Sequence, residues 1–260
     1  PVPPGDLSSF MHGGYAQAQA FGTVVARGTT VQALWIDTRR MRTENDNGAI
    51  FSAISRDDGR SFAGEAATYA DGVCPCCQLT AAAGPGDRVY LGSRSVTADG
   101  FRDSTVARSD DGGRSFGERV RLGSDRWSIN GCPLKPTVVA ADGEHVYAAA
   151  YTGATDPGGV RFAHSADGGR NWGTFDPVHP DAAVSDAPSL VALGRGRLAL
   201  AWHGKLPATA GTPAVRSVYL RTGGDHGRRW SAVTALSDGA SEAGYPALAA
   251  RRDGQLVALW

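Results

Sequence analysis

Four cysteines carry the most distinctive chemistry in this 260-residue chain, because three of them fall within four consecutive positions. Cys74, Cys76 and Cys77 form a Cys-Pro-Cys-Cys run, and Cys132 is the fourth. Thiolates grouped in this way could bind a soft ion such as copper(I) or zinc, although two CxxC pairs are absent. An even number of cysteines is also compatible with structural or redox-active disulfides in an oxidising compartment.

A short acidic segment recurs four times and indicates the elements that must position these cysteines. Its copies are centred on Asp57, Asp111, Asp167 and Asp225, in steps of 54, 56 and 58 residues. A repeat of this length is typical of a four-stranded antiparallel blade with its loops. In each copy the carboxylate can accept backbone N–H bonds, and the following glycine can adopt a positive φ. We therefore expect hairpins in which these aspartates are structural.

A second repeat, in phase with the first, predicts the innermost strand of each sheet. Each copy is a short β-like run, followed by a polar turn and then an apolar strand. The copies begin at Pro136, Pro188 and Pro246, with looser versions at Leu79 and Phe21. The sequence thus predicts five such strand pairs.

With both repeats in phase over nearly its whole length, the chain resembles the sialidase-like Asp-box family, known also for bacterial neuraminidase repeats. The resemblance implies an all-β fold, a β-propeller of four-stranded antiparallel blades forming one domain over residues 1–260. Five strand pairs favour five blades, closed by a strand around Leu7 to Met11, and the alternative is part of a six-bladed sialidase-like propeller. Asp boxes occur in hydrolases, binding proteins and assembly factors, so the family implies a fold and not an activity.

In such a propeller the segments that enter the inner strands share one face, and the boxed turns lie on the other. Cys74 and Cys132 would then meet near the axis from neighbouring blades, where a disulfide could stabilise the fold by about 4 kcal/mol. Cys76 and Cys77 would be left as a vicinal disulfide or as thiols. The alternative is a soft-metal site for copper or zinc made by all four cysteines, with help from Met11, His12 or His203.

The family resemblance also suggests a glycosidase interpretation. Arg40 and Asp46 match a sialidase stretch in which an arginine precedes the general acid by six residues. Asp46 would protonate the leaving oxygen, while Tyr245 would attack or stabilise the sugar. The arginines that hold the substrate carboxylate in sialidases have no counterpart in segment 15–20, which argues against authentic sialidase activity. Further ligand contacts are predicted on the same face at Lys135, Trp127, His203 and Arg102.

Composition narrows the choice of partners. Basic and acidic residues balance at 26 each, so no overall field would attract nucleic acid. The apolar runs are too short to insert into a membrane, and a chain that begins at Pro1 with four cysteines favours a secreted or periplasmic protein. Three functions follow as hypotheses: a propeller that binds a small molecule, glycan or metal; a divergent glycoside hydrolase; and an assembly scaffold with a protein partner.

Overall fold

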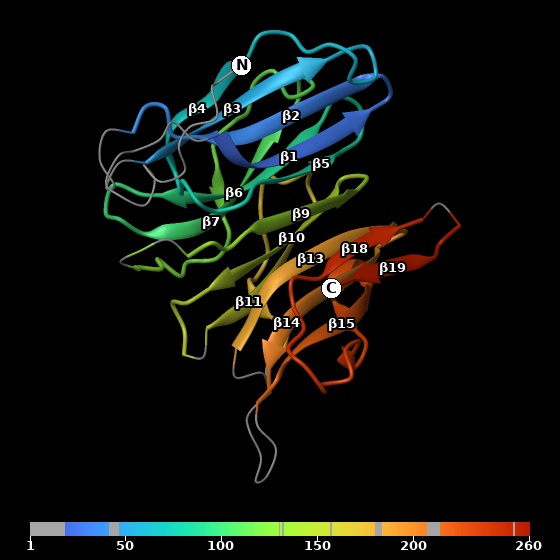
Figure 1. Ribbon diagram of the computed structural model, residues 1–260. Coiled ribbons are helices and arrows are strands. Elements are labelled where there is room, and N and C mark those ends of the chain that lie inside the picture. The colour runs from blue at the N-terminus through green and yellow to red at the C-terminus, as the bar shows by residue number, and fades with distance from the viewer. Residues whose placement is uncertain are drawn as a thin grey trace.

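The regular secondary structure of the described residues is almost entirely β, as the sequence predicts. The computed structural model describes residues 19–41, 47–129, 131, 133–156, 158–179, 184–206, 214–251 and 253–260. Within these ranges helical structure is confined to one 3-10 turn, η1 (Asp225–Gly227) (Figure 1).

The strands form successive antiparallel meanders. The first sheet runs through β1 (Gln19–Arg27), β2 (Thr30–Asp37), β3 (Gly48–Ser55) and β4 (Ala66–Val73). The second comprises β5 (Thr80–Ala83), β6 (Val89–Val96), β7 (Arg102–Ser109) and β8 (Val120–Arg121). A single pairing of Val73 with Ser95 joins β4 to β6, so these two meanders share one hydrogen-bonded sheet.

The later meanders repeat the same order. The third sheet contains β9 (Thr137–Asp142), β10 (His145–Thr152), β11 (Gly159–Ser165) and β12 (Asp176–Pro177). The fourth contains β13 (Val184–Gly194), β14 (Arg197–Lys205), β15 (Arg216–Gly224) and β16 (Arg229–Trp230), with β17 (Thr234–Ala235) also paired to β15. The last is a pair, β18 (Ala247–Ala250) and β19 (Leu256–Leu259).

The five predicted strand pairs are confirmed, because β1, β5, β9, β13 and β18 each pair with the strand that follows. Each of these first strands also contacts the first strand of the next sheet, so they follow one another through the molecule (Figure 1). The described strands do not establish a closed ring, and the number of blades stays a prediction.

Apolar side chains fill the spaces between successive sheets. In β10 the run Val146–Ala150 is fully buried, because one face packs on the second sheet and the other on the fourth. Tyr147 and Trp202 belong to the cluster toward the fourth sheet, whereas Val146 and Ala148 belong to the cluster toward the second. A strand that is covered on both faces has a continuous apolar sequence, which explains the alanine-rich sequence of β10.

Three of the four boxed turns have the expected hydrogen bonds. Asp57 accepts the Ser55 hydroxyl at 2.6 Å and the Ser61 backbone N–H at 2.9 Å. The hydrogen bonds from the Ser55 and Ser61 side chains hold the pKa of Asp57 at about 2. Asp111 and Asp167 repeat this arrangement. The fourth copy differs, because it has Gly223 in place of the serine, and Asp225 instead lies 3.7 Å from Arg229.

The boxed turn of the first sheet and the cysteine run lie at opposite ends of β4, since the turn precedes this strand and Cys74 follows it. We call the end that carries the cysteines and the starts of the inner strands the entry rim, and the other end the box rim.

Candidate ligand site at the entry rim

The cysteine loop between β4 and β5 is compact and oxidised. Cys74 and Cys77 are fully buried and form a disulfide with a Cα–Cα distance of 5.5 Å. The Cys76 sulfur lies 3.7 Å from that of Cys74, and the described cysteines include no free thiol. The expected Cys74–Cys132 disulfide is therefore wrong, because Cys74 already bonds within its own turn, where the backbone N–H of Cys77 donates to its carbonyl at 3.4 Å. Cys132 itself lies outside the described residues.

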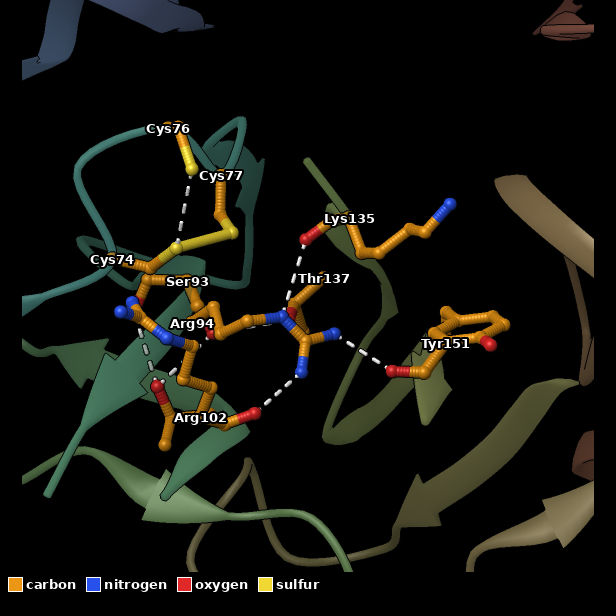
Figure 2. Close-up of a disulfide and its surroundings, with 10 residues drawn as sticks. Cys74, Cys76, Cys77, Ser93, Arg94, Arg102, Lys135, Thr137 and Tyr151 are labelled. Carbon is orange, nitrogen blue, oxygen red and sulfur yellow. Dashed lines mark hydrogen bonds between the residues drawn. A yellow bond between two sulfur atoms is a disulfide. The ribbon is translucent and has the colours of Figure 1, made fainter. Parts of the chain in front are cut away.

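A buried arginine beside this loop ties the second sheet to the third (Figure 2). Arg94 of β6 is 1% exposed, and its backbone carbonyl accepts the N–H of Cys74 at 2.9 Å. Its guanidinium donates to the carbonyls of Arg102 at 2.6 Å and Tyr151 at 2.7 Å, and to that of Lys135 at 3.4 Å. Burial lowers the pKa of Arg94 to about 10, so it stays charged at neutral pH. The guanidinium thus holds together three segments of the entry rim, those that contain Arg102, Lys135 and Tyr151.

The polar centre of the entry rim is formed by Lys135, Asp186 and His203. Lys135, just before β9, forms an ion pair with Asp186 at the start of β13, and its ammonium also lies 5.1 Å from the centre of the Tyr151 ring. The Nε2 atom of His203 in β14 is 3.8 Å from the same Asp186 oxygen. Lys135 and Asp186 are 51 positions apart in the sequence. They nevertheless belong to one partly buried cluster of polar side chains.

Hydrogen bonding fixes the histidine of this group. The backbone N–H of Tyr245 donates to His203 Nδ1 at 2.9 Å, so the neutral ring carries its proton on Nε2, toward Asp186. Burial lowers the pKa of His203, and the Asp186 carboxylate opposes that shift only in part. The site therefore combines the Lys135–Asp186 ion pair with an imidazole whose burial favours its neutral form.

Strained backbone marks the entry to the last two inner strands. Ala187 and Tyr245 each precede a proline and have φ values of 47° and 55°, in the left-handed region that non-glycine residues seldom adopt. Such strain persists only where the surroundings impose it, and it clusters at functional sites. The strained turn at Tyr245 leaves its side chain 73% exposed, 5.0 Å from the His203 ring. An aromatic face is thereby presented beside the polar centre.

The other predicted ligand contacts are differently placed. Trp127 is only 7% exposed and packs with its ring 5.0 Å from the Arg94 guanidinium, so it supports the rim from inside. Arg102 lies beside it, and in the described structure its Nε and Nη1 atoms are buried without a hydrogen-bond acceptor. Arg40 is exposed, with its guanidinium 5.6 Å from the Phe51 ring. Asp46 and His12 lie outside the described residues.

The structure thus brings together Lys135, His203 and Tyr245, three of the predicted residues, but it also uses two that sequence reasoning missed. Asp186 follows no motif, and only its place before Pro188 at an inner-strand start could have drawn attention to it. Arg94 had a weak signal, since it is a charged residue inside an otherwise small and apolar strand. Their roles depend on partners 51 and 57 residues away.

Comparisons with known proteins agree on the fold. No protein-family model matches the chain, and no curated protein matches its sequence. Among solved structures, an α-L-arabinanase from Penicillium chrysogenum, complexed with arabinobiose, is similar with a TM-score of 0.63 and 15% identity, over 93% of this chain and 74% of that one. The GH93 α-L-arabinofuranosidase of Fusarium graminearum, also with arabinobiose, gives 0.60 and 15% over the same shares.

A sialidase is similar over a smaller part of its length. The Trypanosoma rangeli sialidase in complex with sialic acid has a TM-score of 0.54 and 13% identity, over 93% of this chain and 43% of that one. The chain therefore has an all-β fold similar to that of these glycoside hydrolases, which agrees with its resemblance to sialidase-like proteins. No helix among the described residues is long and apolar enough to cross a bilayer.

Proposed function

We propose that the entry rim binds a glycan or a related small polyhydroxy ligand at Lys135, Asp186, His203 and Tyr245. The observation that carries this proposal is the shared contact of Lys135 and His203 with one Asp186 carboxylate, beside the exposed Tyr245 ring. Hydroxyl groups both donate and accept hydrogen bonds, so they match a site that offers a carboxylate, an ammonium and an imidazole N–H.

Two further features support a carbohydrate in particular. Sugar-binding sites combine a few polar groups with an aromatic face, and Tyr245 is an exposed aromatic residue beside the polar centre. Several solved structures with this fold are glycoside hydrolases, two of them in complex with arabinobiose and one with sialic acid. The sugar identity is not carried over at 13–15% sequence identity, so arabinobiose and sialic acid serve as first probes.

Binding is tested by calorimetry with these two sugars and by a glycan array. Tyr245→Ala and Asp186→Asn should each weaken binding by about 10-fold or more, since each removes one principal contact at about 1.4 kcal/mol or more. Phe62→Ala is the matched control, because Phe62 is also an exposed aromatic residue, at 46%, but belongs to the box rim. Binding that survives both entry-rim substitutions would place the ligand elsewhere.

The same proposal can be extended from binding of a sugar to its hydrolysis. Glycosidases use two carboxyl groups, and Asp186, which forms an ion pair with Lys135, is one candidate for a charge stabiliser. The acid would then be Asp46, with Arg40 and Tyr245 as its expected companions. Release of chromophore from a panel of aryl glycosides, lost in Asp46→Asn, would establish hydrolysis. Binding without turnover would leave a lectin-like function.

A soft-metal site in the cysteine loop is a second candidate, because the sulfurs of Cys74, Cys76 and Cys77 lie within 4.8 Å of one another. Copper(I) or zinc would require thiolates, so only the reduced loop could bind it. Metal analysis with a thiol count, before and after reduction, tests this candidate. A count of four oxidised cysteines that resist reduction in the folded protein would eliminate it.

The disulfide also supports a secreted or periplasmic location, because structural disulfides persist in oxidising compartments. Fractionation of the native host with an antibody to the chain tests this directly. A partner recovered by pull-down, with no sugar or metal bound, would favour the assembly scaffold instead.

A further inference from the structure

Three histidines meet at the box rim, away from the proposed ligand site. His145 begins β10, His164 lies near the end of β11, and His226 belongs to η1 of the next sheet. His145 Nδ1 is 2.9 Å from His164 Nε2, and the rings of His145 and His226 stack with centroids 3.6 Å apart. One ring nitrogen from each of the three lies within 4.8 Å of the others.

His226 lies at a position of the boxed turn where the backbone is left-handed. In the other boxed turns the corresponding residues are Asp58, Gly112 and Gly168, with φ values of 60°, 78° and 71°. His226 occupies the same left-handed region at 59°, where glycine is favoured. This copy of the box also lacks the serine that stabilises the others. The fourth turn therefore lacks the serine of the other boxes and carries an imidazole that contacts His145 of the neighbouring sheet.

Neighbouring groups hold that imidazole in place. The backbone N–H of His226 donates to the Gly196 carbonyl at 2.9 Å, and the Tyr147 hydroxyl is 2.8 Å from its Nδ1 atom. Gly196 leaves room for the ring, since a Cβ atom there would lie 2.9 Å from it. An outer hydrogen bond of this kind orients metal-binding histidines in proteins.

The histidines are electrically suited to act as ligands. Burial, followed by the proximity of the other two rings, lowers the pKa of His164 to about 4, and burial also lowers that of His145. Neutral rings offer the lone pairs that a metal requires. The charged groups around the cluster carry both signs, and they are Asp142, Glu144, Arg228 and, through its contact with Glu144, Arg88.

The cluster opens to solvent on one side. His164 and His226 line a cavity of about 500 Å³, together with Asp176, Arg228 and Trp230. A fourth coordination position on this side could hold water or a small ligand, as in zinc sites with three protein ligands.

We propose that His145, His164 and His226 form a three-histidine site for a divalent transition-metal ion, with zinc as its typical occupant and the fourth position open to the cavity. Imidazole nitrogens suit zinc, copper(II) and nickel and not calcium or magnesium. Zinc–nitrogen bonds of about 2.0–2.1 Å in a tetrahedral site separate the ligand atoms by about 3.3 Å. To admit the ion, the 2.9 Å hydrogen bond between His145 and His164 would open by a few tenths of an ångström. The stacked rings of His145 and His226 would also turn, so that their in-plane lone pairs converge on it.

The test uses untagged protein that has been stripped with chelator and titrated with Zn²⁺ by calorimetry and with Co²⁺ by its visible absorption. We expect one ion per chain, with nitrogen ligands in the cobalt spectrum. His226→Gly introduces the glycine that the second and third boxes carry at this position, so it should fold while weakening the affinity for the metal by more than about 100-fold, beyond what loss of an outer partner costs. His164→Gln should do the same, and circular dichroism of both apo variants verifies their folding.

Cys76→Ser is the control that separates this site from the cysteine loop, and it should retain full zinc affinity. The proposal is overturned if folded wild-type protein binds no zinc, or if both histidine variants bind it as wild type does. It is also overturned if the affinity disappears in Cys76→Ser while the histidine variants keep it.

Discussion

Lys135 and Asp186 form an ion pair across the boundary between the third and fourth sheets, with side chains that are 25% and 13% exposed. The pair joins the start of β9 to the start of β13. Since neither group is freely solvated, this interaction contributes more than an ordinary surface ion pair. It therefore couples the stability of the entry rim to the charges proposed to bind the ligand.

Asp186→Ala should lower the free energy of unfolding by about 2 kcal/mol, because it leaves a partly buried ammonium without its partner. Lys135→Ala should cost a similar amount, and the double variant should cost clearly less than the sum of the two. Urea unfolding of all four proteins gives the coupling energy, which we expect to exceed about 1 kcal/mol. Additive costs within about 0.5 kcal/mol would mean that the pair contributes no coupling.

Arg94→Met should destabilise the fold by more than about 3 kcal/mol. The substitution keeps much of the side-chain volume but leaves the carbonyls of Arg102 and Tyr151 without their charged donor. Arg94→Lys should recover part of the lost stability, because lysine keeps the positive charge. The recovery should be incomplete, because lysine cannot reproduce the planar guanidinium geometry. The matched control is Arg126→Met, whose 58% exposed side chain should matter by less than about 1 kcal/mol. Equal unfolding midpoints for the two methionine variants would contradict this account.

Gly92→Ala tests how closely the second and third sheets approach. A Cβ atom at Gly92 would lie 2.2 Å from the backbone carbonyl oxygen of Thr137, so the two sheets would have to separate. We expect a loss of about 3 kcal/mol or more in chemical unfolding, from overpacking. Gly64→Ala is the control, because its Cβ would meet no atom within 4 Å and should change stability by less than about 1 kcal/mol. A Gly92→Ala protein as stable as wild type would show that the sheets are not held at this distance.

His164 predicts a pH dependence for the metal-free protein. Its pKa is about 4 in the folded chain and about 6.5 in an unfolded one, so the unfolded state binds the extra proton between these values. The favourable contribution of neutral His164 to the free energy of unfolding is therefore fully present above about pH 6.5 and is lost as the pH falls toward 4. His164→Gln should flatten the unfolding free energy over this window relative to wild type. Parallel pH profiles for the two proteins, measured with chelator present, would contradict the assignment.

The sequence alone determined the parts of the fold that depend on local interactions. The boxed turns were predictable because Asp57, Asp111 and Asp167 bond to residues two to four positions away, and such hydrogen bonds leave a repeated local pattern. The strand pairs were predictable for the same reason, since each pair is joined by a short turn.

The tertiary structure decided which distant residues meet. Cys74 bonds with Cys77, whereas Cys132 was the partner expected from the sequence. Arg94 and Asp186 find their partners across sheet boundaries, and His226 reaches His145 from the next sheet. Contacts of this kind depend on how the sheets pack against one another, and that packing is fixed by the burial of whole apolar faces, which no single motif in the sequence encodes.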